Sequence, residues 1–446
     1  MRKLVPLLLL IAFSVAALAQ TIRQPNADYR ARRMALSEKT NGGAVLLFAG
    51  TEAEGQNATN GFRQDDYFYY LTGWAEPGAA LLISPAVPAK DDKSARPYEE
   101  ILFLPAHNVS QERWTGPKLG PENRDARQIT GFDRVEVLDR LRDELVRVLP
   151  QPRSTVFSDL PAYGETSPSG GPLQWLQRAN AFPNYNSLED VKPLIDEMRM
   201  RKDAGEMELI RYATNASVAA HLAALKSLKP GLQEIQIAWL MEYTFGEKGC
   251  ERPAYAPIVG AGFNSTVLHY EAGHNVIKDG DVVVMDVAGE YGMYASDITR
   301  TAPANGHFTL RQREIYNIVL GAQQAAIDAF QSGKFVINPR AENSLYKVAY
   351  DYINTHGKDS HGQPLGKYFI HGLSHYVGLE VHDTGSTKVP IGPGMVFTIE
   401  PGIYIPEEKI GARIEDIFWV DPSGKLVMLS QGLPRTADEV ETSMAP

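Results

Sequence analysis

A carboxylate stands inside the most strongly strand-like part of this chain. Residues 282–288 are apolar and largely β-branched except for Asp286, and a glycine-containing turn separates them from a second strand-like run, residues 293–301. Two such runs around a turn predict a β-hairpin. A carboxylate in the middle of a buried strand requires a compensating charge, which a divalent cation provides. Asp297, across the turn, would reach the same ion if the hairpin folds back on itself.

A second group of metal-ligand residue types lies further along the chain. Residues 371–383 contain three histidines, in a chain that has only ten, and two glycines, which let backbone approach a ligand closely. An apolar, strand-like segment then ends in Glu400, and Glu415 lies in another. Read singly, each residue has a structural alternative, a solvated strand-edge carboxylate or a core histidine. The candidate ligands in strand or strand-edge segments are Asp286, Asp297, His375, Glu400 and Glu415.

Four carboxylates and one imidazole form an oxygen-rich ligand set. Such a set suits Mn, Fe, Co or Mg better than a thiolate-preferring zinc site does. Carboxylates that bridge would hold two ions about 3.5–4 Å apart, the spacing of metal-assisted hydrolysis. The pattern therefore predicts a two-metal hydrolase.

These segments resemble the pita-bread metallopeptidases and, among them, the aminopeptidase P subfamily. The resemblance runs from about residue 29 to about residue 430, nearly the whole mature chain. Residues 62–74 resemble the N-terminal domain of this subfamily, which methionine aminopeptidases lack. The motifs that carry the resemblance are LHY at 268–270, ASDITRT at 295–301, HGLSH at 371–375, VHD at 381–383, EPG at 400–402 and RIED at 413–416.

The resemblance implies a mixed α/β (α+β) fold in two domains. We expect a signal peptide over residues 1–19, an aminopeptidase P-like α/β domain over 20–188 and a pita-bread catalytic domain over 189–446. A length of 446 residues and an apolar fraction of 43% fit two sizeable cores. Residue patterns predict helices over 26–37, 140–149, 204–228 and 233–248 and N-terminal strands over 44–48, 79–84 and 100–104. In the resembled fold, two helix pairs pack on a curved antiparallel sheet with an internal pseudo-twofold, which the two carboxylate-bearing hairpins would echo.

Metal roles carry over from the resemblance residue by residue. It implies that Asp286 binds one ion, that Asp297 and Glu415 bridge both, and that His375 and Glu400 bind the second. The expected ions are two divalent metals, foremost Mn²⁺, with Co²⁺, Fe²⁺ or Zn²⁺ as alternatives. In such enzymes a bridging water or hydroxide is the nucleophile, and Glu400 would accept its proton.

Further residues match positions that act on substrate without binding metal. The resemblance implies that His269, His371 and His382 contact substrate and stabilise the tetrahedral intermediate or move protons. Arg413 matches an arginine that supports the ligands, and it stands two residues before Glu415, so that both side chains would share one strand face.

Structural alternatives stay open for three of these residues. His269 would otherwise pack beside its neighbour Tyr270, and His382 would cap a turn together with the following aspartate. Arg413 would otherwise pair at the surface with Glu415 or Asp416.

The implied activity is a metal-dependent aminopeptidase that releases the first residue of peptides with proline in the second position. An Xaa-Pro bond has no N–H, so a dedicated pocket is required. Two alternatives remain, an Xaa-Pro dipeptidase (prolidase) and a metal-free pita-bread binding scaffold. The LSH motif at 373–375 and the N-terminal segment favour the aminopeptidase, and the intact ligand set disfavours the scaffold. The short interval between Glu400 and Glu415 leaves the outer pocket, and with it the preferred peptide length, open.

The net charge and the N-terminal sequence limit the partners and the cellular location that we expect. A net charge of −10 argues against nucleic acid or an anionic membrane as partner. Residues 1–19 combine a basic start, an apolar core and an Ala-Leu-Ala site, which is typical of a signal peptide and predicts a periplasmic or secreted protein. No other stretch is apolar enough to span a bilayer, so we expect no stable membrane anchor. Cys250 is the only cysteine, so no internal disulfide is possible, and we interpret it as a packing residue.

The resemblance also implies a homo-oligomer, a dimer or tetramer in which the N-terminal domain contributes to a neighbour's active-site entrance. The aromatic residues 67–70, with Trp74 close behind them, offer apolar material for such a contact. A core strand explains these aromatics equally well.

Overall fold

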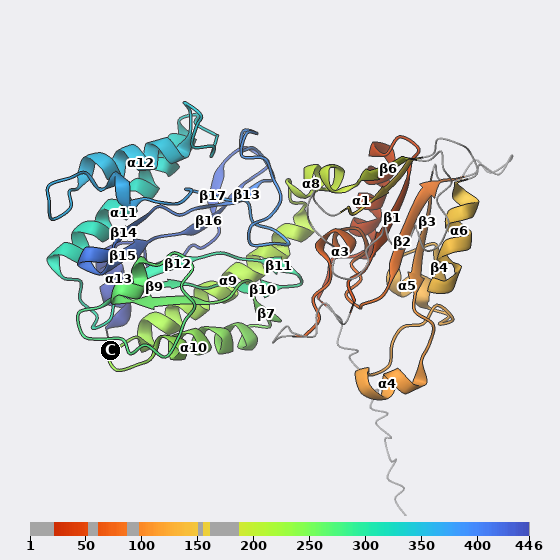
Figure 1. Ribbon diagram of the computed structural model, residues 1–446, viewed down its shortest axis with the longest axis horizontal. Coiled ribbons are helices and arrows are strands. Elements are labelled where there is room, and N and C mark those ends of the chain that lie inside the picture. The colour runs from red at the N-terminus through yellow and green to blue at the C-terminus, as the bar shows by residue number, and fades with distance from the viewer. Residues whose placement is uncertain (1–21, 52–60, 87–97, 150–154, 161–186, 446) are drawn as a thin grey trace, which may run out of the picture.

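Two bodies lie side by side in the computed structural model, which describes residues 22–51, 61–86, 98–149, 155–160 and 187–445 (Figure 1). The N-terminal body is red to yellow and the C-terminal body is green to blue. The predicted signal peptide, residues 1–19, lies outside the described residues. No helix of the described part is long and apolar enough to cross a membrane.

The N-terminal body is built on a six-stranded mixed sheet with the order β4-β3-β2-β1-β5-β6. Successive side chains of a strand point to opposite faces, so alternate apolar residues enter two cores. In β1, Val45 and Leu47 pack into one core and Leu46 into the other. The strands are β1 (Ala44–Phe48), β2 (Ala80–Pro85), β3 (Tyr98–Leu104), β4 (Arg134–Val137), β5 (Thr155–Ser158) and β6 (Ser187–Asp190). The predicted domain boundary, between residues 188 and 189, falls within β6.

Helices cover both faces of this sheet, and a short one projects from it. The helix α4 stands away from the sheet at the lower edge of Figure 1 and buries none of its residues. The helical elements are α1 (Asn26–Lys39), α3 (Asp66–Thr72), α4 (Val109–Thr115), α5 (Ala126–Thr130), η1 (Leu138–Arg140), α6 (Leu141–Val148) and α8 (Lys192–Arg199).

The aromatic residues 67–70 form α3 rather than a strand. Asp65 caps this helix, accepting a hydrogen bond from the backbone N–H of Phe68 at 2.7 Å. Phe68 and the two tyrosines that follow are buried in the core, so they are not available for a contact between subunits. The core interpretation of these aromatics therefore holds, although the element is a helix.

The C-terminal body contains two pairs of long helices packed on small antiparallel sheets, as expected from the resembled fold. The helix α9 begins with a capping box formed by Asp203 and Glu206, and α11 begins with one formed by Thr309 and Gln312. The pairs are α9 (Ala204–Ser227) with α10 (Glu234–Glu247) and α11 (Leu310–Gln331) with α12 (Leu345–His356). The remaining helical elements are η2 (Gly262–Thr266), η3 (Leu365–Tyr368), η4 (Pro406–Glu408) and α13 (Ala437–Met444).

The strands of this body form several short sheets rather than one continuous ladder. One sheet holds β8 (Ile258–Ala261), β9 (Val282–Asp286) and β12 (Thr299–Pro303), and another holds β13 (Val396–Ile399), β16 (Asp416–Val420) and β17 (Leu426–Met428). A two-stranded sheet pairs β14 (Gly402–Ile405) with β15 (Ile410–Arg413). A three-stranded sheet combines β7 (Arg252–Pro253), β10 (Gly289–Tyr291) and β11 (Tyr294–Ala295). The mixed α/β class predicted from the sequence is confirmed.

The single hairpin predicted for residues 282–301 is wrong in its details. β9 does pair with β12, but the chain between them leaves that sheet to form the tight hairpin β10–β11 beside β7. Gly292 and Met293 make its turn with φ values of 57° and 73°, both positive, as a two-residue hairpin turn of the primed type requires. Asp286 is consequently the last residue of its strand and not its middle, and Asp297 lies between two strands.

The two strand pairs that carry the candidate carboxylates are arranged alike. Asp286 at the end of β9 faces Thr299 at the start of β12, and Ile399 at the end of β13 faces Asp416 at the start of β16. An isolated bridge between Thr299 and Glu415 joins the two pairs. This arrangement supports the predicted internal pseudo-twofold and brings the carboxylates to one place.

Candidate active site

Strand ends position all four candidate carboxylates. Asp286 ends β9 and Glu400 directly follows β13. Asp297 lies two residues before β12, and Glu415 directly precedes β16. His375 is not in a strand, but its backbone carbonyl accepts a hydrogen bond from Thr398 N in β13 at 3.0 Å. Side chains at strand ends face the pocket instead of the sheet interior, which is why the chain tolerates them beside apolar runs.

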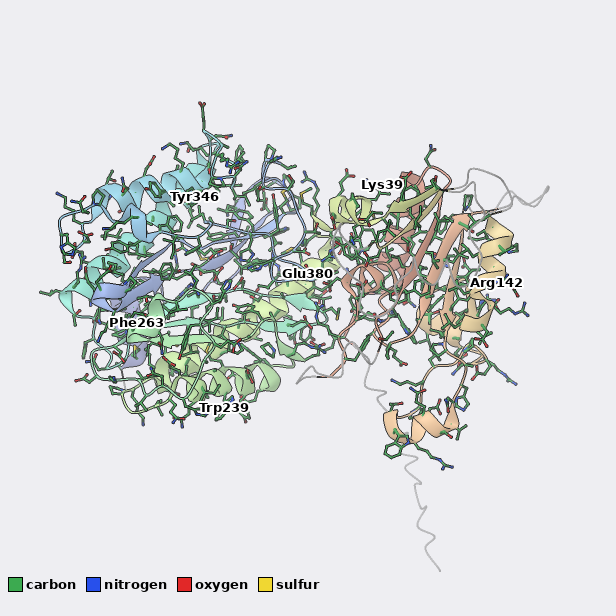
Figure 2. The ribbon with its side chains drawn as sticks, viewed as in Figure 1. Lys39, Arg142, Trp239, Phe263, Tyr346 and Glu380 are labelled. Carbon is green, nitrogen blue, oxygen red and sulfur yellow. The ribbon has the colours of Figure 1, made fainter. Side chains whose placement is uncertain are left out.

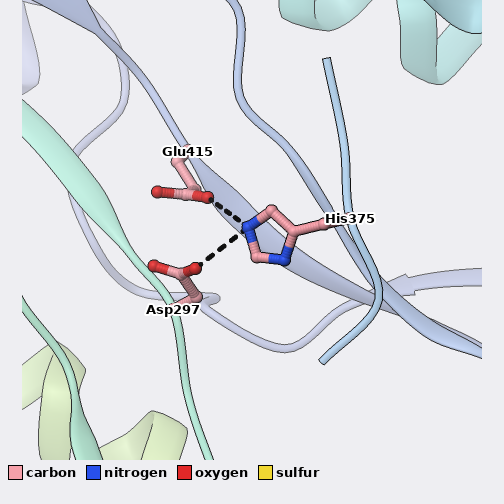
Figure 3. A group of neighbouring side chains, drawn as sticks. All are labelled: Asp297, His375 and Glu415. Atoms are coloured by element: carbon pink, nitrogen blue, oxygen red, sulfur yellow. Dashed lines mark ion pairs between the residues drawn. The ribbon is translucent and has the colours of Figure 1, made fainter. Parts of the chain in front are cut away.

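The imidazole of His375 lies among three of these carboxylates. Its Nε2 is 3.2 Å from Asp297 Oδ2, 3.4 Å from Glu400 Oε1 and 3.8 Å from Glu415 Oε1. Figure 3 shows Asp297 and Glu415 converging on this nitrogen from two different segments, with ligand-type atoms of all three residues within 4.8 Å of one another. We call Asp286, Asp297, His375, Glu400 and Glu415 the ligand cluster.

Tyr255 connects Asp286 to the rest of the ligand cluster, and Arg413 binds the same aspartate. The Tyr255 hydroxyl lies 2.6 Å from Asp286 Oδ1 and 2.7 Å from Asp297 Oδ1. One hydroxyl proton serves only one carboxylate at a time, so a cation or a further proton must relieve the other contact. Arg413 Nη2 donates to Asp286 Oδ2 at 2.6 Å, and the guanidinium is buried. The surface pairing considered for Arg413 is therefore wrong.

Glu415 is fixed from both its backbone and its side chain. Its N–H donates to Thr299 O at 3.1 Å, and its Oε2 accepts from the Thr299 hydroxyl at 2.7 Å. The Nε of Arg413 donates to the same hydroxyl oxygen at 3.1 Å. Arg413 thus hydrogen-bonds Asp286 directly and is linked to Glu415 through the Thr299 hydroxyl, and both Arg413 and Glu415 face the same pocket.

The electrostatics of the ligand cluster favour bound cations. Burial, and then the neighbouring carboxylates, raise the pKa of Glu415 well above its usual range. Burial likewise raises the pKa of Asp286, and it raises that of Glu400 to about 7. His375 loses hydration on burial, yet Asp297 and Glu400 raise its pKa to about 9. Burial is the largest cause of the shift for all three carboxyls, and the neighbouring carboxylates add to it. Protons compensate the buried carboxylates here, and divalent cations would compensate their ionised forms.

The donor set therefore fits two divalent metal ions. It offers four carboxylates and one imidazole, within a buried site that holds a single arginine among them. Hard oxygen donors with one nitrogen match the first-row divalent metals and Mg²⁺. The individual ligand roles remain predictions.

His371 is held by a chain of hydrogen bonds that starts at Arg413. Arg413 Nη1 donates to the Tyr404 hydroxyl at 2.8 Å, and that hydroxyl donates to His371 Nε2 at 2.8 Å. His371 Nδ1 lies 2.7 Å from the carbonyl of Gly372, which requires the proton on Nδ1. Burial and then the charge of Arg413 lower the pKa of His371 to about 3, so the imidazole is neutral.

His382 and His269 line the open part of the same pocket. The ring of His382 lies edge-on to that of His375, with centroids 4.4 Å apart. The neighbouring Asp383 is buried and pairs with Arg199 and Lys202, so it does not form a turn cap with His382. His269 is exposed, which excludes the core-packing alternative for it.

The pocket that contains these groups has a volume of about 670 Å³. It is lined by all five residues of the ligand cluster, by Arg413 and by the three predicted substrate histidines, together with apolar residues such as Ile258, Leu268 and Val381. The structure therefore brings every site residue predicted from the sequence into one pocket.

Sequence reasoning missed three side chains of this site. Tyr255, Thr299 and Tyr404 each hydrogen-bond a predicted site residue. Thr299 lies inside the quoted motif at 295–301, but its hydroxyl carried no signal of its own. The two tyrosines are among twenty in the chain, and only their tertiary contacts distinguish them.

Comparisons with known proteins agree on one family. Residues 208–422 match the family described as metallopeptidase family M24, and residues 29–157 match the aminopeptidase P N-terminal domain. The chain is 31% identical to the Xaa-Pro aminopeptidase of Haemophilus influenzae, with 96% of this chain and 99% of that protein covered. It is 29% identical to the human Xaa-Pro dipeptidase, with 96% and 95% covered. Its fold matches the structure of Pseudomonas aeruginosa aminopeptidase PepP with a TM-score of 0.80, 30% identity and 95% and 98% covered.

Proposed function

The chain belongs to metallopeptidase family M24, and from this premise we propose that it is a metal-dependent Xaa-Pro aminopeptidase. It would release the first residue of peptides that carry proline in the second position. The observation that carries the proposal is the convergence of five ligand-type side chains in one pocket of the C-terminal body, in a chain that also has an aminopeptidase P N-terminal domain. The intact set argues against a metal-free binding scaffold.

The five residues of the ligand cluster would hold two divalent ions, foremost Mn²⁺. When bound, the ions supply Lewis acidity and lower the pKa of a coordinated water. Arg413 hydrogen-bonds Asp286, and Tyr255 hydrogen-bonds Asp286 and Asp297, so these two residues would hold the carboxylates in place for the ions. Glu400 lies 3.6 Å from His371 Nδ1, at the side of the cluster where a proton acceptor would meet the substrate histidines.

The charges of the pocket favour the aminopeptidase over the dipeptidase. An Xaa-Pro dipeptide places a terminal carboxylate directly after the proline ring, and a site that binds it needs a cation there. Among the described residues that line the pocket, the one cationic side chain of Lys or Arg type is Arg413, which is already paired with Asp286. A longer peptide carries no charge at that position.

Hydrolysis of paired substrates tests this function. An Xaa-Pro dipeptide and an Xaa-Pro-Yaa tripeptide are incubated with the purified protein plus Mn²⁺, and then with a chelator. Chelator-sensitive release of the first residue from the tripeptide is the expected result. Cleavage of the dipeptide alone would mean a prolidase, and cleavage of neither would revive the scaffold. Metal analysis of protein purified without added metal identifies the native ion.

We also propose that the protein is exported. The support is the signal-peptide pattern of residues 1–19, whose cleavage after Ala19 would leave Gln20 as the first residue. Expression of the full chain, followed by fractionation and N-terminal sequencing, tests this. A cytoplasmic protein that retains residues 1–19 would contradict it.

A homo-oligomer is the third proposal, with α4 as a contact between subunits. This helix projects from the N-terminal body, and its Trp114 is 89% exposed. Large exposed aromatics are enriched at interfaces. Light scattering of the wild-type protein should give a dimer or tetramer that Trp114→Ala weakens. Trp239→Ala, at an exposed position on α10 in the other body (Figure 2), is the matched control.

A further inference from the structure

The rim of the pocket includes a rigid segment between η2 and β9, residues 267–275. Its anchor is Glu234 at the start of α10, which is fully buried. The Glu234 carboxylate accepts hydrogen bonds from Ala261 N at 2.8 Å, from Tyr270 OH at 2.8 Å and from the side-chain amides of Asn264 and Asn275, each at 3.0 Å. These donors all belong to the stretch that contains the rim, so one buried carboxylate fixes its conformation.

Backbone hydrogen bonds fix the same rim segment as well. Ala272 N donates to Pro257 O at 3.4 Å, and Gly273 O accepts from Ile235 N at 2.9 Å. Residue 271 therefore stands between Tyr270, whose hydroxyl is tied to Glu234, and Ala272, whose backbone is tied to residue 257. Contacts of both neighbouring residues therefore hold the backbone at this position in place.

That side chain is Glu271, which is exposed and lines the pocket. Within the described part of the chain its carboxylate has no hydrogen bond or ion pair. The other charged residues of the pocket lining belong to the ligand cluster or, as Arg413 does, pair within it. Two divalent ions would neutralise the four carboxylates of that cluster. Glu271 is then the charge that a bound peptide meets at the mouth.

The rest of the pocket lining leaves the charge of Glu271 unopposed. Besides the ligand cluster, Arg413 and the histidines, this lining includes apolar residues such as Ala256, Leu268 and Val381. No Lys or Arg of the described chain lines this part of the pocket, so the rim attracts cations and repels anions.

We propose that Glu271 selects peptides that carry a basic side chain after the proline, at the third position. This inference rests on the proposed function, because cleavage after the first residue places the scissile bond at the ligand cluster. The remainder of the peptide then leaves through the mouth, where a Lys or Arg side chain meets the Glu271 carboxylate. An acidic third residue, or a free carboxylate there, meets repulsion.

Tripeptide amides of the form Ala-Pro-Xaa-NH₂, with Lys, Gln or Glu as Xaa, test the proposal without a terminal carboxylate. We expect kcat/KM to fall from Lys to Gln and again from Gln to Glu, by about two- to fivefold at each step, as for a partly exposed ion pair. The preference should shrink at high ionic strength because salt screens the interaction. Lys-Pro-Gln-NH₂ should show no comparable advantage, since its basic residue precedes the proline.

Two variants assign the preference to this residue. Glu271→Gln should abolish the order of the three peptides, and Glu271→Lys should reverse it, while both retain the metal content of the wild type. Glu247→Gln, an exposed substitution in the last turn of α10 that lies outside the pocket lining, should keep the wild-type order.

The outcomes separate this proposal from the function on which it rests. If no peptide is cleaved, the proposed function fails and not the role of Glu271 alone. If all three peptides are cleaved at equal rates, or if Glu271→Gln keeps the wild-type order, the role assigned to Glu271 is wrong. An advantage of Lys at the first position instead of the third would also overturn it.

Discussion

Two carboxylates that are neighbours in the sequence, Glu415 and Asp416, have opposite surroundings although both are buried. Asp416 Oδ1 lies 2.6 Å from Arg300 Nη2 and accepts from the Ser430 hydroxyl at 2.6 Å. These partners outweigh burial, so the pKa of Asp416 is lowered. Glu415 meets other carboxylates, which add to the effect of burial and raise its pKa well above the usual range.

The comparison distinguishes a buried carboxylate that is compensated within the protein from one that requires a bound cation. The Asp416 network, formed by Asp416, Arg300, Ser430 and Gln323, contains its own counterion and its own hydrogen-bond donors. The ligand cluster has four carboxylates, and its one histidine together with the neighbouring Arg413 does not balance all of them. Equal burial therefore stabilises one site as it stands and makes the other depend on added cations.

We expect the largest effect from replacing a carboxylate of the ligand cluster. Glu415→Gln should remove bound metal and lower kcat/KM by on the order of a thousandfold or more, because metal catalysis supplies several kcal/mol. The metal-free variant should be more stable than metal-free wild type, since folding near neutral pH no longer has to protonate and bury this carboxyl. Metal analysis, kinetics and melting in chelator measure the three quantities. Asp297→Ala should likewise lose metal and activity together, and normal activity in that variant would sink the two-metal interpretation.

We expect the next largest effect from substitutions in the Asp416 network. Asp416→Asn leaves the Arg300 guanidinium buried without its counterion, so we expect a loss of about 3–5 kcal/mol of unfolding free energy. Urea denaturation in the presence of a chelator measures it. Ser430→Ala, which removes one hydrogen bond to the same carboxylate, should lose only about 1 kcal/mol. A neutral result for Asp416→Asn would show that the two regions do not differ as described.

A smaller effect tests whether His382 belongs to the ligand cluster. His382 lies on the pocket wall beside His375 and forms no hydrogen bond or ion pair with a carboxylate of the described residues. His382→Ala should therefore lower turnover by roughly a hundredfold while metal content is retained. His307→Ala, whose side chain is 83% exposed and outside the pocket lining, is the control. Loss of both ions in His382→Ala would mean that this histidine belongs to the ligand cluster.

The smallest effect concerns pH. The pKa of Glu400 in the metal-free fold is raised from 4.5 to about 7, so the native state binds a proton that the unfolded chain releases. Stability from this group is full below the unfolded pKa of 4.5 and is lost as pH rises through the folded pKa of about 7.

Metal reverses this dependence, because its binding requires ionised carboxylates. The melting temperature of chelator-treated protein should fall between mildly acidic and mildly alkaline pH, and that of Mn²⁺-loaded protein should rise relative to it. The gap should widen by on the order of 2 kcal/mol in unfolding free energy. Parallel curves for the two forms would contradict the excess negative charge of the ligand cluster.

Local patterns predicted most of the regular structure. The helix predicted over residues 204–228 appears as Ala204–Ser227, and the strand over 44–48 appears with the same bounds. Turn chemistry was harder to predict. The chain leaves the β9 sheet after Asp286 and pairs as β10 with β7 before Gly292 and Met293 turn it into β11. The spacing of apolar residues along the chain predicts that a segment is a strand, but it does not predict which sheet that strand joins.

The sequence by itself determined the chemical identity of the site. Carboxylates at the ends of apolar strands, and histidines with glycines between them, are local features, since each arises from residues close together in the chain. The tertiary structure alone decided the partners. Arg413 binds Asp286, Tyr255 joins Asp286 to Asp297, and Glu234 fixes the rim that carries Glu271. These contacts join segments far apart in sequence, and only the packing of the helix pairs against the sheets brings such segments within hydrogen-bonding distance.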